Sequence, residues 1–170
     1  MKGRCMAEGD PILIDRTKVF DPSLIENGFR IHRQSDVALS IERITKLSQI
    51  AVFYEENPAT RRETLERQGF IALDAQAGYC LFQNGYFVFD LMMTMADKPA
   101  DSEIVFDGSV FLGPNGAEHL LAAYHWHSET FHFTKGYKIW DSHKWKFRYR
   151  EFNKQYGTPY SLCIAKSKMG

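Results

Sequence analysis

The sequence has few cysteines and no motif that pairs them. Cys5, Cys80 and Cys163 are the only three in 170 residues, and no two have the short spacing of a zinc knuckle or a redox motif. An odd number of cysteines in a chain without a secretory signal indicates free thiols. Long apolar runs are missing too, because none reaches the roughly 18 residues of a membrane-spanning helix. We therefore expect no membrane partner.

Several common ligand motifs are also missing. No glycine-rich phosphate loop occurs, because Gly113–Gly116 has the pattern of a hairpin turn and not of a strand-to-helix cradle. The acidic residues show no calcium-loop spacing. Residues 1–10 are polar and lack the apolar core of a signal peptide. We expect no cofactor and a cytoplasmic protein, with secretion that needs no cleaved signal as the alternative.

The composition is that of a folded domain with a sheet-rich core. Apolar residues make up 44% of the chain and aromatic residues 14%. We expect a flexible N-terminus over residues 1–10 and a single α+β domain over residues 11–170. Residues 50–54 are β-branched and aromatic, which predicts a strand.

Two helices have clear start and stop signals in the N-terminal half. Asn57-Pro58 predicts the start of a charged helix that ends at Gly69. Asp74 is the expected cap of a second helix, which continues to about Asn84. The apolar stretch 86–95 suits either a buried strand or a third helix.

The C-terminal half has the pattern of a sheet. Asp107-Gly108 predicts a hairpin turn between strands 104–106 and 110–112. A further turn at 114–116 precedes a long strand over 119–127, and 144–150 and 162–165 suit additional strands. The expected fold is therefore an N-terminal, mainly helical half packed on a C-terminal antiparallel β-meander.

One heptapeptide alternates cations with aromatic residues, from Lys144 to Arg150. Side chains in a strand point alternately to opposite faces, so the cations and the aromatic rings should separate. The rings of Trp145, Phe147 and Tyr149 are expected to cover the core. The cations are expected outside, as candidate contacts for a partner or as residues that protect an edge strand. These four cations are Lys144, Lys146, Arg148 and Arg150.

The charges of the chain are divided unevenly, although the formal net charge is zero. Residues 1–134 carry 12 Lys and Arg against 19 Asp and Glu, a balance of −7. Residues 135–170 carry 9 against 2, a balance of +7. Such a split either marks a surface for a charged partner or reflects two regions that complement each other in the fold.

A histidine pair suggests a possible metal site. His125 and His127 are two residues apart on an expected strand, so they share a face and could supply two zinc ligands. Histidines in this position also commonly line the solvent face of a sheet. His119 has the same parity as this pair, and Glu129, His132 and Asp141 are candidates for a third or fourth ligand.

A second candidate site is catalytic. Cys80, His125 and Asp141 occur in the order found in several thiol hydrolases. The position of Cys80, about two turns into its helix and on the apolar face, favours a core residue instead, because the helix dipole lowers a thiol pKa only near the first turn.

The order of several short motifs resembles a group of uncharacterised bacterial proteins. The motifs are Phe20-Asp21-Pro22, Gly69-Phe70-Ile71-Ala72-Leu73-Asp74-Ala75, Phe106-Asp107-Gly108-Ser109 and Tyr124-His125-Trp126. The resemblance implies no activity and no catalytic residue. The histidines around Trp126 and the basic stretch 144–150 lie outside the shared pattern.

The leading hypothesis is a small non-enzymatic interaction protein. Its basic C-terminal surface would bind an acidic surface of another protein. A hydrolase that uses Cys80 or a histidine-rich metal site is one alternative. A nucleic-acid-binding protein is the other, although stacking on bases and contacts to phosphate could not both come from one strand whose rings and cations separate.

Overall fold

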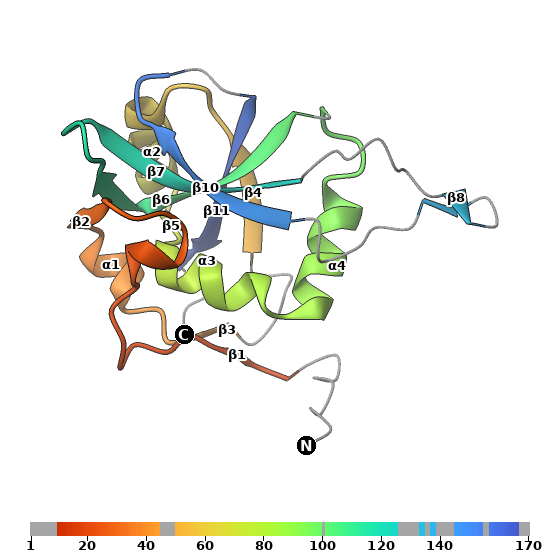
Figure 1. Ribbon diagram of the computed structural model, residues 1–170. Helices are drawn as coiled ribbons and strands as arrows, with labels where there is room; N and C mark the ends of the chain where they lie inside the picture. Colours follow the sequence, from red (N-terminus) through yellow and green to blue (C-terminus); the bar gives the residue numbers. More distant parts are fainter. Residues whose placement is uncertain are drawn as a thin grey trace.

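A seven-stranded sheet organises the part of the chain that the structure describes, with helices on both of its faces (Figure 1). The computed structural model describes residues 10–44, 50–99, 101–125, 133–134, 137–138, 145–154 and 157–166. Its helices are the 3-10 turn η1 (Pro22–Leu24) and the α-helices α1 (Asp36–Leu39), α2 (Pro58–Arg67), α3 (Ala75–Phe82) and α4 (Gly85–Thr94). The strands of the sheet are β2 (Arg30–Gln34), β4 (Ile50–Tyr54), β5 (Phe70–Ala72), β6 (Ser102–Leu112), β7 (Glu118–His125), β10 (Trp145–Glu151) and β11 (Thr158–Ala165).

The sheet is largely antiparallel, but it is not a simple meander. Its main order is β10-β7-β6-β11-β4, with β2 also paired to β6 and β5 also paired to β11. The neighbours β6 and β11 run parallel, and the other pairs are antiparallel. The expected α+β class is correct. The expected division into a helical N-terminal half and a C-terminal meander is wrong, because β2, β4 and β5 enter the same sheet.

Two smaller sheets stand beside the main one. The strand β1 (Ile12–Leu13) pairs antiparallel with β3 (Arg43–Ile44). The strand β8 (Phe133–Thr134) pairs antiparallel with β9 (Tyr137–Lys138). Together with the main sheet, they place strands in both halves of the described chain.

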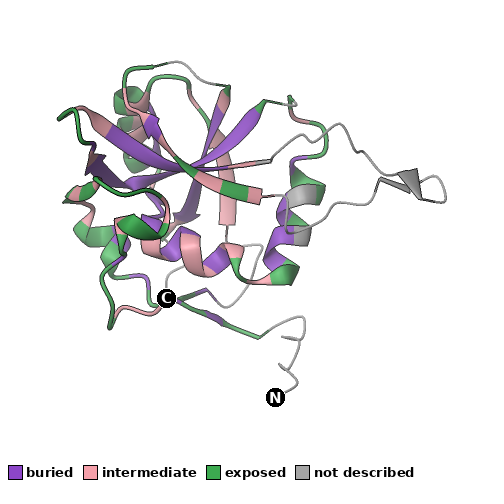
Figure 2. Cartoon of the chain, viewed as in Figure 1, coloured by how far each residue is buried: buried purple, intermediate pink, exposed green. Residues whose placement is uncertain are grey.

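The larger core lies between the sheet and the pair α3 and α4, on what we call the α3–α4 face. Phe106 of β6 is fully buried there and its ring packs edge-on against Phe82, with centroids 6.0 Å apart. At Gly78 a Cβ atom would lie 2.4 Å from the Phe106 ring, so the glycine lets α3 approach the sheet closely. Figure 2 shows the buried residues concentrated along the strands and exposed ones along α2.

The opposite face of the sheet, called the α2 face, carries a smaller core. Leu65 of α2 is fully buried in a cluster with Ala72 and Cys163. Beside it, the guanidinium of Arg61 forms two hydrogen bonds with the carboxylate of Asp107, at 2.7 and 2.6 Å, and both side chains are buried. This ion pair, together with Leu65, fixes α2 to the sheet.

Both helices with clear signals form as expected. The Asn57 side chain accepts a hydrogen bond from Ala59 N at 3.0 Å at the start of α2, and Asp74 caps α3. The apolar stretch 86–95 is the helix α4, and the strand at 50–54 is β4. These segments carry local signals that do not depend on the rest of the fold.

The expected hairpin turn at Asp107-Gly108 is wrong, because both residues lie inside the continuous strand β6. The pairing of β6 with β7 shifts register between Phe106 and Phe111, which indicates a bulge. Gly108 N donates to Leu73 O at 3.0 Å, so the glycine lies where another segment of backbone approaches the strand.

Candidate functional site

The aromatic residues of β10 face the core, as the alternation predicted. Trp145, Phe147 and Tyr149 are half-buried and pack against the main core. The Tyr149 ring stacks on Phe29 with centroids 3.9 Å apart, and its hydroxyl donates to Pro22 O at 2.8 Å. Burial raises the pKa of Tyr149, and nearby acidic charges add to the shift. The hydroxyl therefore stays protonated and links β10 to the N-terminal turn.

The cations of β10 lie on the α2 face and differ in exposure. Lys146 is exposed, and the side chain of Arg148 is 44% exposed. The side chain of Arg150 is only 4% exposed. The expectation that Arg150 lies outside is therefore wrong, and Lys144 falls outside the described residues.

A buried carboxylate explains the position of Arg150. The Glu103 side chain on β6 is 1% exposed, and Arg150 Nη1 lies 2.8 Å from its Oε2. Arg148 Nη2 pairs with Glu103 Oε1. The arginines reach Glu103 across β7, where the small side chain of Ala122 is opposite Arg148. A carboxylate removed from water needs such charged partners, because an unpaired one would be costly.

Arg148 has a second contact that holds its side chain in place. Its guanidinium carbon lies 4.3 Å from the centroid of the Tyr124 ring, which is cation–π geometry. Tyr124 is opposite both Lys146 and Glu103 in the sheet. On the α2 face, Lys146 and Arg148 are therefore exposed to solvent, and Arg148 is held in place. The buried carboxylate beside them, Glu103, is paired with arginine.

The described residues do not test the proposed thiol site, because only one of its three side chains is among them. Cys80 is half-buried in α3, packs against the main core and accepts a long hydrogen bond of 3.9 Å from Gln76 Nε2. The backbone of His125 ends β7, but its side chain falls outside what is described. Asp141 lies outside the described residues as well. The catalytic hypothesis therefore stays a prediction.

The other described cysteine is poorly suited to nucleophilic chemistry. Cys163 is fully buried in β11 and its thiol donates to Ala51 O at 3.5 Å. Burial, together with the negative charge of Asp107, raises the pKa of Cys163 to about 12. The reactive thiolate is therefore scarce at neutral pH.

We expect native Cys163 to resist alkylation by iodoacetamide near pH 8. Its raised pKa keeps it as the thiol, and burial blocks the reagent. Mass spectrometry of peptides can compare labelling of native and denatured protein, with Cys80 in the same sample as a half-buried control. Equal labelling rates of Cys163 in both states would contradict the prediction.

No group of three or more possible metal ligands comes together among the described residues. His119 Nδ1 lies 2.9 Å from Ala117 O, and its ring packs edge-on against Phe29. His127 and the further candidates Glu129 and His132 fall outside the described residues, so the expected histidine pair is not tested.

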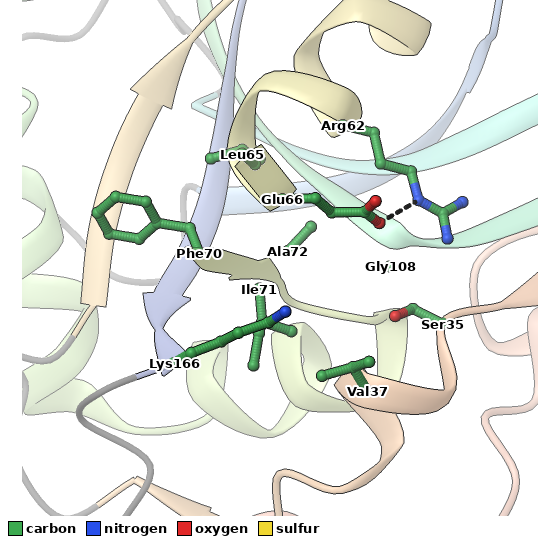
Figure 3. Close-up of a pocket in the computed structure, with 10 residues that line it drawn as sticks. All are labelled: Ser35, Val37, Arg62, Leu65, Glu66, Phe70, Ile71, Ala72, Gly108 and Lys166. Carbon is green, nitrogen blue, oxygen red and sulfur yellow. Dashed lines mark hydrogen bonds and ion pairs between the residues drawn. The ribbon is translucent and has the colours of Figure 1, made fainter. Parts of the chain in front are cut away.

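A pocket of about 190 Å³ opens between α1, α2 and β5, near the end of β11 (Figure 3). Residues of α1, α2, β5 and β6 and the residue after β11 form it, and no sequence motif predicted that these segments meet. The lining residues are Ser35, Val37, Arg62, Leu65, Glu66, Phe70, Ile71, Ala72, Gly108 and Lys166.

Comparisons with protein-family models, curated proteins and solved structures gave no match. Of the helices in the described part of the chain, none is long and apolar enough to span a membrane.

Proposed function

We propose that the protein is a non-enzymatic interaction protein that binds an acidic surface of another protein through Lys146 and Arg148. The observation that carries the proposal is the shared exposure of these two cations on one face of β10. Arg150, although basic, belongs to the interior and is not part of this contact.

The fixed position of Arg148 supports a binding role. Its contacts to Glu103 and Tyr124 restrict the side chain before any partner arrives. A partner then loses less side-chain entropy on binding than it would with a free arginine. Arg150 also pairs with Glu103, so the two arginines share this one carboxylate.

An acidic protein fits this surface better than nucleic acid does. Single strands bind by base stacking beside a cationic groove. Here the β10 rings pack into the core while Lys146 and Arg148 point to the other face, so β10 offers charge without a stacking surface. We propose the cytoplasm as the compartment, and the free thiols of Cys80 and Cys163 support it.

The test removes both positive charges. Lys146 is replaced by an acid, but Arg148 is replaced by neutral glutamine because it lies beside the buried carboxylate of Glu103. The double variant Lys146→Glu with Arg148→Gln should lose the partner captured by the unchanged protein from host lysate, because the attractive potential is removed. Quantitative mass spectrometry of the captured proteins measures this. Thermal unfolding shows whether the variant is folded. The single Lys146→Glu variant, at an exposed residue, should show a smaller loss of binding.

The control variant carries Lys18→Glu with Arg67→Gln, two exposed cations elsewhere on the chain. It should capture the same partner as the unchanged protein. Loss of binding in both double variants, or in neither, contradicts the proposal. Capture that disappears after nuclease treatment and falls steeply with salt would instead assign the surface to nucleic acid.

A further inference from the structure

The pocket between α1, α2 and β5 combines an apolar wall with charged groups, and its parts are held by backbone contacts. Lys166 N donates to Gly69 O at 2.8 Å, which fixes the end of β11 beside β5. Ser35 N donates to Gly108 O at 2.8 Å, which fixes the start of α1 against β6. The lining is therefore formed by segments that the sheet itself positions.

The wall of the pocket suits a small carbon skeleton. Ile71 and Leu65 line it as buried residues on either side of β5, and Val37, which also lines it, is 45% exposed. The volume of about 190 Å³ exceeds the roughly 150 Å³ that is enough for a benzene ring in an apolar cavity. One ring or a short branched chain therefore fits, and a larger ligand does not fit entirely.

The polar groups of the pocket favour an anion. Lys166 extends its side chain from the end of β11 along Ile71 toward the middle of the lining residues (Figure 3). None of the ion pairs among the described residues involves the Lys166 ammonium. Arg62 Nε, in contrast, lies 3.4 Å from Glu66 Oε1, so that pair largely neutralises itself.

A hydroxyl group can assist the Lys166 ammonium. Ser35 Oγ accepts a hydrogen bond from Ala38 N at 3.3 Å, so its own proton remains to be donated. The Ser35 oxygen points toward the pocket in Figure 3. An ammonium and a hydroxyl beside an apolar wall are complementary to a carboxylate attached to a small hydrocarbon body.

We propose that this pocket binds a small monocarboxylic acid whose body is one ring or a short branched chain. The carboxylate pairs with Lys166 and accepts from Ser35, and the body packs on Val37 and Ile71. Glu66 lies in the same lining and opposes the anion, so it limits the affinity. This site is separate from the Lys146 and Arg148 surface and does not depend on the function proposed for it.

Benzoate is the probe, with benzyl alcohol as the uncharged comparison. Titration of the full chain, followed by amide chemical shifts, should show benzoate shifting residues of the pocket lining more strongly than benzyl alcohol does. Lys166→Gln should weaken benzoate by about 3- to 5-fold, the range of an exposed ion pair. Glu66→Gln should strengthen it by a similar factor, because the opposing charge is removed.

Two further variants make the result decisive. Arg67→Gln removes an exposed cation one residue from Glu66 and outside the lining, and it should leave benzoate binding unchanged. Val37→Trp should block the mouth and abolish binding, with thermal unfolding little changed because Val37 is exposed. The proposal is overturned if millimolar benzoate shifts none of the lining amides, if the two probes bind alike, or if Lys166→Gln and Arg67→Gln have the same effect.

Discussion

Replacement of Arg61 by leucine is expected to lower the free energy of unfolding by roughly 3–5 kcal/mol, the cost of leaving one member of a buried ion pair alone. Arg61 and Asp107 are 1% and 3% exposed, and two hydrogen bonds join them. Arg61 Nη1 also donates to Glu55 O at 2.7 Å. Urea unfolding of the variant and of the unchanged protein measures the difference.

The neighbouring residue supplies the control. Arg62→Leu removes an exposed pair with Glu66 and should cost at most about 1 kcal/mol. The double variant Arg61→Leu with Asp107→Leu should recover much of the loss, because no charge then remains buried. If Arg61→Leu costs no more than Arg62→Leu, the ion pair is not what fixes α2 to the sheet.

Replacement of Gly108 by alanine is expected to lower the free energy of unfolding by roughly 3 kcal/mol, at the upper end for overpacking. An added Cβ would lie 2.7 Å from Asp74 N and 2.8 Å from both Ala72 O and Leu73 C. These are backbone atoms at the junction of β5 and α3, so they cannot rotate away as a side chain can. Denaturant unfolding gives the value.

Gly85→Ala is the matched control, because a Cβ atom at this first residue of α4 meets nothing within 4 Å. It should leave stability unchanged or raise it by up to about 1 kcal/mol. Equal stability of the two variants would show that Gly108 does not lie against the backbone of another segment. That result would return Asp107-Gly108 to the turn that local sequence suggests.

Local signals predicted single elements better than their arrangement. Asn57 and Asp74 act as helix caps because a side-chain oxygen next to the first free amides is enough to start a helix. The prediction of a turn at Asp107-Gly108 was wrong because a glycine there suits two structures equally, a tight turn and a close approach of two backbones. Only the neighbours of Gly108 in the fold distinguish them.

The candidate sites show the same limit. The alternation along β10 correctly placed Trp145 and Tyr149 toward the core, since a strand has a period of two. It could not separate Arg150 from Arg148, because both have the same parity and both pair with Glu103 on another strand. They differ in burial, which the surrounding fold sets. The pocket could not be predicted from sequence either, since its lining comes from segments far apart in the chain.

Local sequence was sufficient for the α+β class, two capped helices and the separation of rings from cations in residues 145–150. These depend on backbone geometry and on neighbours a few residues away. Tertiary structure alone decided the mixed sheet, the burial of Arg150 and the position of Lys166 over an apolar pocket. Strand order and charge pairing are set by contacts between distant residues, and no local pattern records which distant segments will meet.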